Sequence, residues 1–315
     1  NQFGVAEGLD NLNSTNPAPG SPSAVLLANL DGLNEQQFQQ ALNQLSPQRY
    51  DTPHNTNRQA NQGMVNTLQQ YLLGRRFGMP TSGTGGGTQL GLMFDADGEN
   101  PYLMMLADDS AESKNIRDRI AGDGFLPGTK LNVWVQGFYI NASQQSTGDT
   151  IGYDANTGGG MVGLDFPVLD NLLVGISFGF SGTHANYKSP GGNLDQYNYR
   201  IGPYVSWEPI ERLYIDFSAS YGFSQINSTR VTTNGLNQVN ANSDYNGHDI
   251  NVYLGAEYDV IPDRQWYVAP LIGFNYTWFH QDGFTETGAG AANMVVDPQE
   301  TNSLDMRVGG RFAWL

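Results

Sequence analysis

Apolar and polar residues alternate with a period of two from Asn132 to the end of the chain. The clearest segment is 174–181, in which valine, isoleucine and phenylalanine alternate with glycine and serine. The same pattern recurs in other segments, near 197–207, 212–224, 249–258 and 303–314. Strict alternation is typical of β-strands, and it predicts about eight antiparallel strands in this region.

The alternation has two interpretations, a soluble sandwich with an apolar core or a membrane barrel with an apolar outer face. The apolar face continues for about 10 residues per strand, the length that a tilted membrane strand needs. Sandwich strands are commonly about 5–6 residues long. The polar face combines glycine and serine with occasional charged residues, as the lumen of a barrel allows. The pattern therefore favours an all-β, antiparallel transmembrane β-barrel.

The connections between the predicted strands alternate in length. Short turns are predicted near 167–171, 208–212 and 261–265, and long loops near 144–155, 182–195, 225–247 and 280–302. Outer-membrane barrels have short periplasmic turns and longer extracellular loops. The first strand is then expected to leave the periplasm, and the last to return to it.

The tryptophans fit this orientation as an interfacial girdle, four of them at periplasmic strand ends and Trp278 at an outer end. The predicted girdle consists of Trp134, Trp207, Trp266, Trp278 and Trp314.

The N-terminal part of the chain has a different pattern. Residues 1–80 are rich in Asn, Gln, Leu and Ala, and three segments have helical spacing: 24–33, 35–45 and 58–76. Residues 79–89 contain many glycines, which predicts a flexible linker, and 90–130 is ambiguous between strand and loop. We expect a helical region over 1–80, a linker over 81–130 and the barrel over 131–315.

Composition narrows the classes of function. The chain has 15 Lys and Arg against 31 Asp and Glu, and the net charge of −16 argues against nucleic acid as a partner. It contains no cysteine, which suits a chain that crosses an oxidising periplasm unfolded. It begins at Asn1 without a charged and apolar targeting segment, so we expect that a signal peptide has been cleaved or lies outside this chain.

Charged residues on the polar faces are the main candidates for a function. The lumen-lining candidates are Arg200, Arg212, Asp216, Glu257, Arg307 and Arg311. They are expected either to line a pore and hold a plug segment by charge pairing, or to pair among themselves and stiffen the barrel.

Two further patterns are weaker hints of chemistry. Three histidines fall at predicted outer strand ends: His184, His248 and His280. His248 precedes Asp249, and some outer-membrane hydrolases keep a His–Asp pair at that rim, but three polar rim residues are the favoured interpretation. The segment from Asp95 to Asn100 resembles half a calcium loop but lacks the final glutamate, so a polar turn is expected. A G-x-S-x-G match at 175–179 lies within the clearest predicted strand rather than at a strand-to-helix turn, so no nucleophile elbow is expected. We expect no enzymatic activity, no metal and no cofactor.

Three successive segments carry a family resemblance: NVWVQGFYINASQQ, GYDANTGGGMVGLDF and NLLVGISFGFSGTHANY. They resemble the opening strands of an autotransporter β-domain, the translocator of type V secretion. Upstream, LNEQQFQQALNQLSPQRYDT resembles the helical segment that leads into that domain. The resemblance covers most of 25–80 and 131–315.

The resemblance implies a twelve-stranded outer-membrane barrel, an N-terminal passenger drawn outward through it and a helix left in the pore. It also implies partners: outer-membrane lipid and lipopolysaccharide, the barrel assembly machinery and periplasmic chaperones.

The sequence departs from the family in its strand count, in ending in Trp-Leu and in having no long β-helical passenger before the helical segment. An eight-stranded barrel is filled by side chains, whereas a wider one leaves a channel. We therefore expect either a complete eight-stranded barrel or a larger barrel whose other strands are absent from this chain. Two other functions stay open: a surface-anchoring structural protein that binds a partner or itself, and a porin-like diffusion channel.

Overall fold

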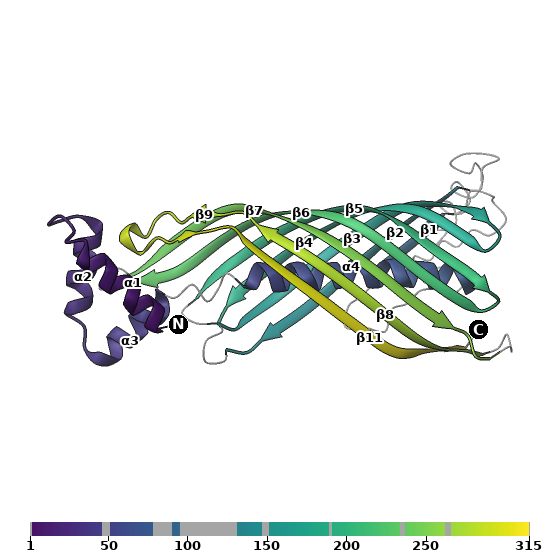
Figure 1. Ribbon diagram of the computed structural model, residues 1–315, viewed down its shortest axis with the longest axis horizontal. Coiled ribbons are helices and arrows are strands. Elements are labelled where there is room, and N and C mark those ends of the chain that lie inside the picture. The colour runs from purple at the N-terminus through teal and green to yellow at the C-terminus, as the bar shows by residue number, and fades with distance from the viewer. Residues whose placement is uncertain are drawn as a thin grey trace, which may run out of the picture.

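The computed structural model describes residues 2–45, 51–77, 90–94, 131–146, 151–188, 191–233, 237–261 and 266–314. Its main feature is a nine-stranded antiparallel sheet that curves around one long helix (Figure 1). Every strand of this sheet pairs with the strand that precedes or follows it along the chain, apart from a small hairpin inserted before the last strand. The predicted antiparallel fold class is confirmed.

The sheet has the order β1-β2-β3-β4-β5-β6-β7-β8-β11. Its strands are β1 (Leu90–Phe94), β2 (Asn132–Gln144), β3 (Tyr153–Leu169), β4 (Leu172–Tyr187), β5 (Gly192–Ile210), β6 (Leu213–Thr233), β7 (Gln238–Tyr258), β8 (Trp266–Gln281) and β11 (Gln299–Trp314). The inserted hairpin pairs β9 (Phe284–Thr285) with β10 (Val295–Val296). In the described part of the chain, β1 and β11 form the two edges of the sheet and are not paired with each other.

In the described residues, four helices precede the strands: α1 (Gln2–Ser14), α2 (Pro22–Asp31), α3 (Glu35–Gln44) and α4 (Thr52–Phe77). Ser21 caps α2, with proline in the first turn, and Asn34 forms a reciprocal capping box with Gln37 at the start of α3. The sequence predicted α2, α3 and most of α4, but not α1. In the described residues, no helix combines the length and apolar character of a membrane span.

The alternating residues separate onto the two faces of the sheet, as β4 shows. Ile176 and Phe178 point outward and are 47% and 44% exposed, whereas Ser177 and Ser181 are buried on the inner face. A sandwich core would bury the apolar face instead. An apolar outer face of this size is stable only against lipid, so the membrane interpretation holds and the sandwich interpretation is wrong.

Two of the predicted long loops are instead continuations of strands. β4 and β5 together occupy most of 182–195, and β6 and β7 occupy most of 225–247. On these extensions the polar residues lie mainly on the outer face, whereas apolar residues such as Leu194, Ile226 and Tyr245 are buried on the inner face. The alternation is therefore reversed relative to the lipid-facing part of the strands, although the backbone pairing continues. The connection between β8 and β11 does form a long loop, which holds β9, β10 and the short helix η1 (Gly290–Ala292).

The short turns all lie at one end of the sheet, where β3 meets β4, β5 meets β6 and β7 meets β8 (Figure 1). We call this the turn end and the opposite end the loop end. Residue range 90–94, left ambiguous by the sequence, is strand β1. The half calcium loop from Asp95 to Asn100 lies outside the described residues.

Candidate functional site: the helix in the lumen

Helix α4 lies along the concave side of the sheet, which we call the lumen (Figure 1). At its start, Thr56 donates a hydrogen bond to Gln196 of β5 (2.6 Å). At its end, Arg76 contacts Ser206 (2.8 Å), close to the β5–β6 turn. The chain therefore enters the lumen at the loop end and leaves it at the turn end.

One face of α4 is apolar and packs against the sheet. It contributes Met64, Leu68, Tyr71 and Leu72 to a cluster whose sheet members are Trp134, Phe138, Met161 and Tyr204. Tyr71 stacks on the Trp134 ring at 4.4 Å with an interplanar angle of 17°. Gly63 allows the close approach, because a Cβ there would lie 2.7 Å from Ile140 Cδ1.

Beside this stack, one buried carboxylate joins the helix to three strands. Asp165 of β3 accepts hydrogen bonds from Tyr71 of α4, from the Tyr204 hydroxyl (2.6 Å) and from the Asn132 amide (2.9 Å). The Trp134 indole N–H in turn donates to the Tyr204 oxygen (2.6 Å). Three donors on one carboxylate offset much of the cost of its burial.

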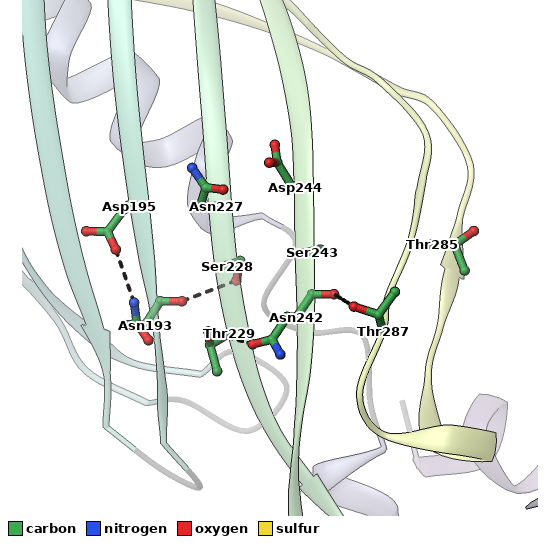
Figure 2. Close-up of a pocket in the computed structure, with 10 residues that line it drawn as sticks. All are labelled: Asn193, Asp195, Asn227, Ser228, Thr229, Asn242, Ser243, Asp244, Thr285 and Thr287. Atoms are coloured by element: carbon green, nitrogen blue, oxygen red, sulfur yellow. Dashed lines mark hydrogen bonds between the residues drawn. The ribbon is translucent and has the colours of Figure 1, made fainter.

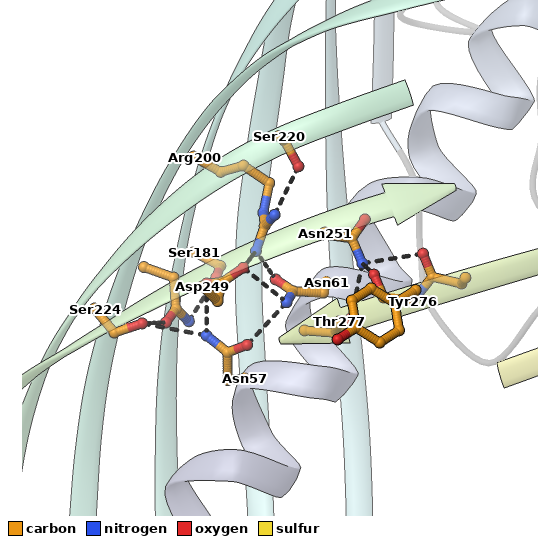
Figure 3. A network of polar contacts seen from close by, with 12 residues as sticks. Asn57, Asn61, Ser181, Arg200, Ser220, Ser224, Asp249, Asn251, Tyr276 and Thr277 are labelled. Carbon is orange, nitrogen blue, oxygen red and sulfur yellow. Dashed lines mark hydrogen bonds and ion pairs between the residues drawn. The ribbon is translucent and has the colours of Figure 1, made fainter. Parts of the chain in front are cut away.

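In the first half of α4, a second network is centred on an ion pair between strands (Figure 3). The Arg200 guanidinium of β5 contacts Asp249 of β7, and both side chains are buried. Asn57 and Asn61, one helical turn apart on α4, donate to the two Asp249 oxygens at 3.2 and 3.3 Å. Arg200 also donates to the Asn61 oxygen and to Ser220. The helix thus completes a charged site that the sheet alone leaves partly unpaired.

Near the turn end, Arg76 of α4 inserts between two acidic side chains. It pairs with Asp216 and lies 3.9 Å from Glu257. Glu257 also pairs with Arg311 of β11 at 2.9 Å. These charges are compensated by one another and by α4, as buried ion pairs require.

A row of polar residues on α4 faces the inner side of β11. Arg58 pairs with Asp305 at 3.1 Å, and Gln62 donates to the same carboxylate at 2.9 Å. The row continues toward both ends through three other pairs, His54 with Thr301, Asn66 with Arg307 and Gln69 with Arg311. We call this row the α4–β11 seam.

The predicted lumen-lining residues do not all reach the lumen. Arg200, Asp216, Glu257, Arg307 and Arg311 point to the inner side and contact α4 or one another, in the pairs described above. Arg212 is a correction, because it lies in the β5–β6 turn with a positive φ of 71° and its main-chain N–H donates to Glu208. Its side chain is 33% exposed and lies 4.0 Å from that of Glu211, outside the contacts with α4 described above.

The tryptophans of the predicted girdle do not all lie on the outer face either. Trp207 points outward and is 44% exposed, and Trp278 lies half-buried on the outer face. Trp134 is a correction, because it is fully buried in the lumen against Tyr71. Trp266 and Trp314 occupy paired backbone positions at the turn end, but their side chains lie outside the described residues.

The histidines of the loop end do not form a catalytic pair with Asp249. His248 lies on the outer face, where its ring nitrogen hydrogen-bonds the Tyr221 hydroxyl, whereas Asp249 points into the lumen. His184 pairs with Asp195, and His280 lies 3.4 Å from Glu300. Adjacent residues of a strand face opposite sides, so the sequence neighbours are separated.

Also at the loop end, Ser143 and Lys188 hydrogen-bond the Asp154 carboxylate and hold its pKa below the usual range.

Beyond the loop end, α1, α2 and α3 form a small helical cap on the strand extensions (Figure 1). Its apolar residues pack against Ala241 of β7 and against Ala289 and Ala292 of the β8–β11 loop. Arg230 of β6 donates to the last carbonyl of α3, at Gln44, at 2.9 Å and pairs with buried Glu286 of the same loop. A cation at a helix C-terminus is favourable, so Arg230 joins the cap, the loop and the sheet.

Sequence reasoning missed Asp165, Asn57, Asn61 and the role of Arg230. The spacing of Asn57 and Asn61, one turn apart on the helix, was the available signal for a polar face toward a buried partner. Asp165 and Arg230 lie on strands whose partners come from distant segments, which the sequence pattern does not identify.

Comparison with known proteins supports the fold and its location. A family model described as the autotransporter beta-domain matches residues 133–315. Outer membrane protein B of Rickettsia rickettsii is 27% identical over 206 residues, which cover 61% of this chain and 12% of that protein. Outer membrane protein A of the same organism is 28% identical over 213 residues, covering 65% of this chain and 9% of its own length. The chain thus spans about an eighth or less of these relatives.

Among solved structures, the translocator domain of autotransporter NalP from Neisseria meningitidis is similar in fold. It superposes with a TM-score of 0.51 at 17% sequence identity, over 64% of this chain and 69% of that one.

Proposed function

Because this chain belongs to the autotransporter β-domain family of the bacterial outer membrane, we propose that its barrel carries its N-terminal segment outward and then anchors it. In this proposal α4 stays in the lumen, and the cap of α1, α2 and α3 is the displayed segment. The observation that carries it is the path of the chain, which enters the lumen at the loop end and leaves at the turn end.

The orientation follows from the connections. Outer-membrane barrels have their short turns in the periplasm. With the turn end in the periplasm, the start of α4 and the whole cap lie outside the cell. The proposed division of the chain is then a displayed cap and lumen helix over 1–80, a connecting segment over 81–130 and the barrel from 131.

The proposal contains no chemical step. The lumen residues near α4 are held in hydrogen bonds and ion pairs to the helix, which supports an anchoring role for them. Secretion would be driven by folding and by assembly, and the barrel assembly machinery and periplasmic chaperones are its proposed partners.

An open diffusion channel is the less favoured function, because the described lumen is filled by α4 along its length. A surface-anchoring role is compatible with the cap, which would then be the part that meets a partner or a second copy of the chain.

Treatment of intact cells with a protease that does not cross the outer membrane tests the display. We expect cuts within 2–45, with the barrel from 131 recovered intact by mass spectrometry. The control is the same digestion after the outer membrane is opened, which should add cuts at the turn end. Protection of 2–45 in intact cells, with cleavage only after opening, would place the cap in the periplasm and overturn the proposal.

A further inference from the structure

On the outer face of the strand extensions, a cavity of about 510 Å³ is lined by short polar residues (Figure 2). Its lining residues are Asn193, Asp195, Asn227, Ser228, Thr229, Asn242, Ser243, Asp244, Thr285 and Thr287. They come from β5, β6, β7 and the β8–β11 loop. We call it the outer cavity; its volume is within the usual range for a small-molecule site, about 300–1,000 Å³.

The floor of the outer cavity is made by two rows of paired strand residues. One row joins Asp195, Asn227 and Asp244 across β5, β6 and β7. The next row joins Asn193, Thr229 and Asn242. Because paired residues of neighbouring strands point to the same face, each row presents its side chains side by side.

The wall of the outer cavity is a fixed part of the β8–β11 loop. Asn242 and Thr287 exchange two main-chain hydrogen bonds of 2.8 Å. On the inner side of the same loop segment, Phe284 stacks on Tyr245 at 4.0 Å and Glu286 pairs with Arg230. Phe284 and Glu286 therefore hold the loop against the sheet, while Thr285 and Thr287 line the cavity. Because the loop is already held in place, ligand binding would cost little of its conformational entropy.

Several polar groups of the outer cavity are free to bind. In the described part of the chain, the side chains of Asn227, Asp244 and Thr285 have no hydrogen-bond partner. They supply an amide, a carboxylate and a hydroxyl, which together offer donors and acceptors to one ligand. By contrast, Asp195 is already engaged by His184 (2.6 Å) and Asn193 (3.2 Å).

The chemistry of the lining selects a class of ligand. The ten described residues include neither Lys nor Arg, and two of them are acidic, which disfavours phosphate and other anions. Apolar ligands would leave the amides and hydroxyls unpaired. A ring of neutral hydroxyl groups, each both a donor and an acceptor, matches amides, hydroxyls and carboxylates together. We propose that the outer cavity binds a neutral hexose unit of a glycan.

The position of the outer cavity suggests two sources for such a sugar. Tyr197 and Tyr199 follow Asp195 on the outer face of β5, toward the turn end. They are 43% and 39% exposed, like the other apolar residues of the outer face. With the turn end in the periplasm, as proposed above, the cavity lies at the level of the lipopolysaccharide sugars, and it is also open to soluble glycans.

The test uses the full chain in detergent micelles, titrated with glucose, galactose, mannose and N-acetylglucosamine under calorimetry or NMR. We expect saturable binding of at least one sugar, weakened about tenfold or more by Asp244→Ala and by Asn227→Ala, since each removes a hydrogen-bonding group. The matched control is Asn141→Ala, an exposed outer-face asparagine on β2, which should leave binding unchanged.

The same variants identify the source. Lipopolysaccharide that stays bound to the wild type through detergent washing and is lost from Asp244→Ala would assign the cavity to the sugars of the membrane. Equal retention by both proteins, together with saturable binding of free sugar, would assign it to soluble glycans. The proposal is overturned if none of the four sugars binds saturably, or if Asp244→Ala and Asn227→Ala bind as tightly as Asn141→Ala.

Discussion

At the scale of the residue, Arg200 and Asp249 show how charged side chains are stabilised in the lumen by an ion pair and by hydrogen bonds to α4. Both side chains are buried, and each has partners on α4 as well as on the sheet. A buried ion pair contributes little net stability, but removing one partner leaves an uncompensated charge. The pair therefore makes the position of α4 specific, because only the seated helix satisfies Asp249 fully.

We predict that Arg200→Met lowers the free energy of unfolding by about 3–5 kcal/mol, measured by denaturant unfolding in micelles. The double variant Arg200→Met with Asp249→Asn should recover a large part of the loss, since no unpaired charge remains. The control is Arg212→Gln, a turn residue, which should change stability by less than about 0.5 kcal/mol. Equal effects of Arg200→Met and Arg212→Gln would contradict this account of the network.

The tryptophans offer a second prediction at this scale. In proteins that retain a single tryptophan, with phenylalanine at the other four positions, brominated lipid chains should quench Trp207 strongly and leave Trp134 almost unquenched. Trp207 is on the lipid-facing side, whereas Trp134 is enclosed by Tyr71 and Tyr204. Similar quenching of both would show that Trp134 faces lipid.

Which residues face the lumen was only partly predictable. Ser and Gly alternate with large apolar residues in β4, so its faces were clear from the sequence. In β2 both faces carry apolar residues, because one faces lipid and the other faces the apolar side of α4. Trp134 was therefore assigned to the wrong face.

At the scale of the element, α4 is held on two sides by different chemistry. Its apolar face packs against β2 and the neighbouring strands, and its polar row meets the edge strand β11 along the α4–β11 seam. The sequence predicted this helix from its apolar stripe alone. The seam was not predictable, because it pairs residues more than 240 positions apart.

At Gly63, α4 approaches β2 so closely that a Cβ would lie 2.7 Å from Ile140 Cδ1. We predict that Gly63→Leu pushes the helix away from Phe138 and Ile140, so that conductance across planar bilayers rises and α4 becomes sensitive to protease. Gly8→Leu in α1 is the matched control, because nothing lies within 4 Å of a Cβ at that helical glycine. Unchanged conductance and protection in Gly63→Leu would mean that α4 does not fill the lumen as described.

Strand extensions were the element that the sequence misjudged most. The many polar residues in 182–195 and 225–247 resembled loops, although β4, β5, β6 and β7 continue through most of these ranges. Beyond the lipid the outer face of these strands is polar and the apolar residues lie on the inner face, so the period of two reverses while the ladder continues. The outer cavity lies on these extensions.

At the scale of the whole molecule, the lumen sets a lower limit on the size of the barrel. Eight strands enclose only their own side chains, whereas a helix needs a wider barrel. Nine strands already curve around α4 here, and neither β1 nor β11 is paired on its second side in the described residues. Lipid does not tolerate open strand edges. The twelve-stranded barrel implied by the family resemblance stays a prediction and is consistent with both facts.

The path of the chain through the lumen is the central claim, and single cysteines test it most directly because the native chain has none. Three variants would be labelled in cells with a maleimide that does not cross the outer membrane: Asn13→Cys in the cap, Ala60→Cys on buried α4 and Asp170→Cys in the β3–β4 turn. We predict that Asn13→Cys is labelled in intact cells, that Asp170→Cys is labelled only after the outer membrane is opened, and that Ala60→Cys is labelled only after denaturation. Labelling of Ala60→Cys in intact cells, or of Asn13→Cys only after opening, would contradict a helix that fills the lumen beneath a displayed cap.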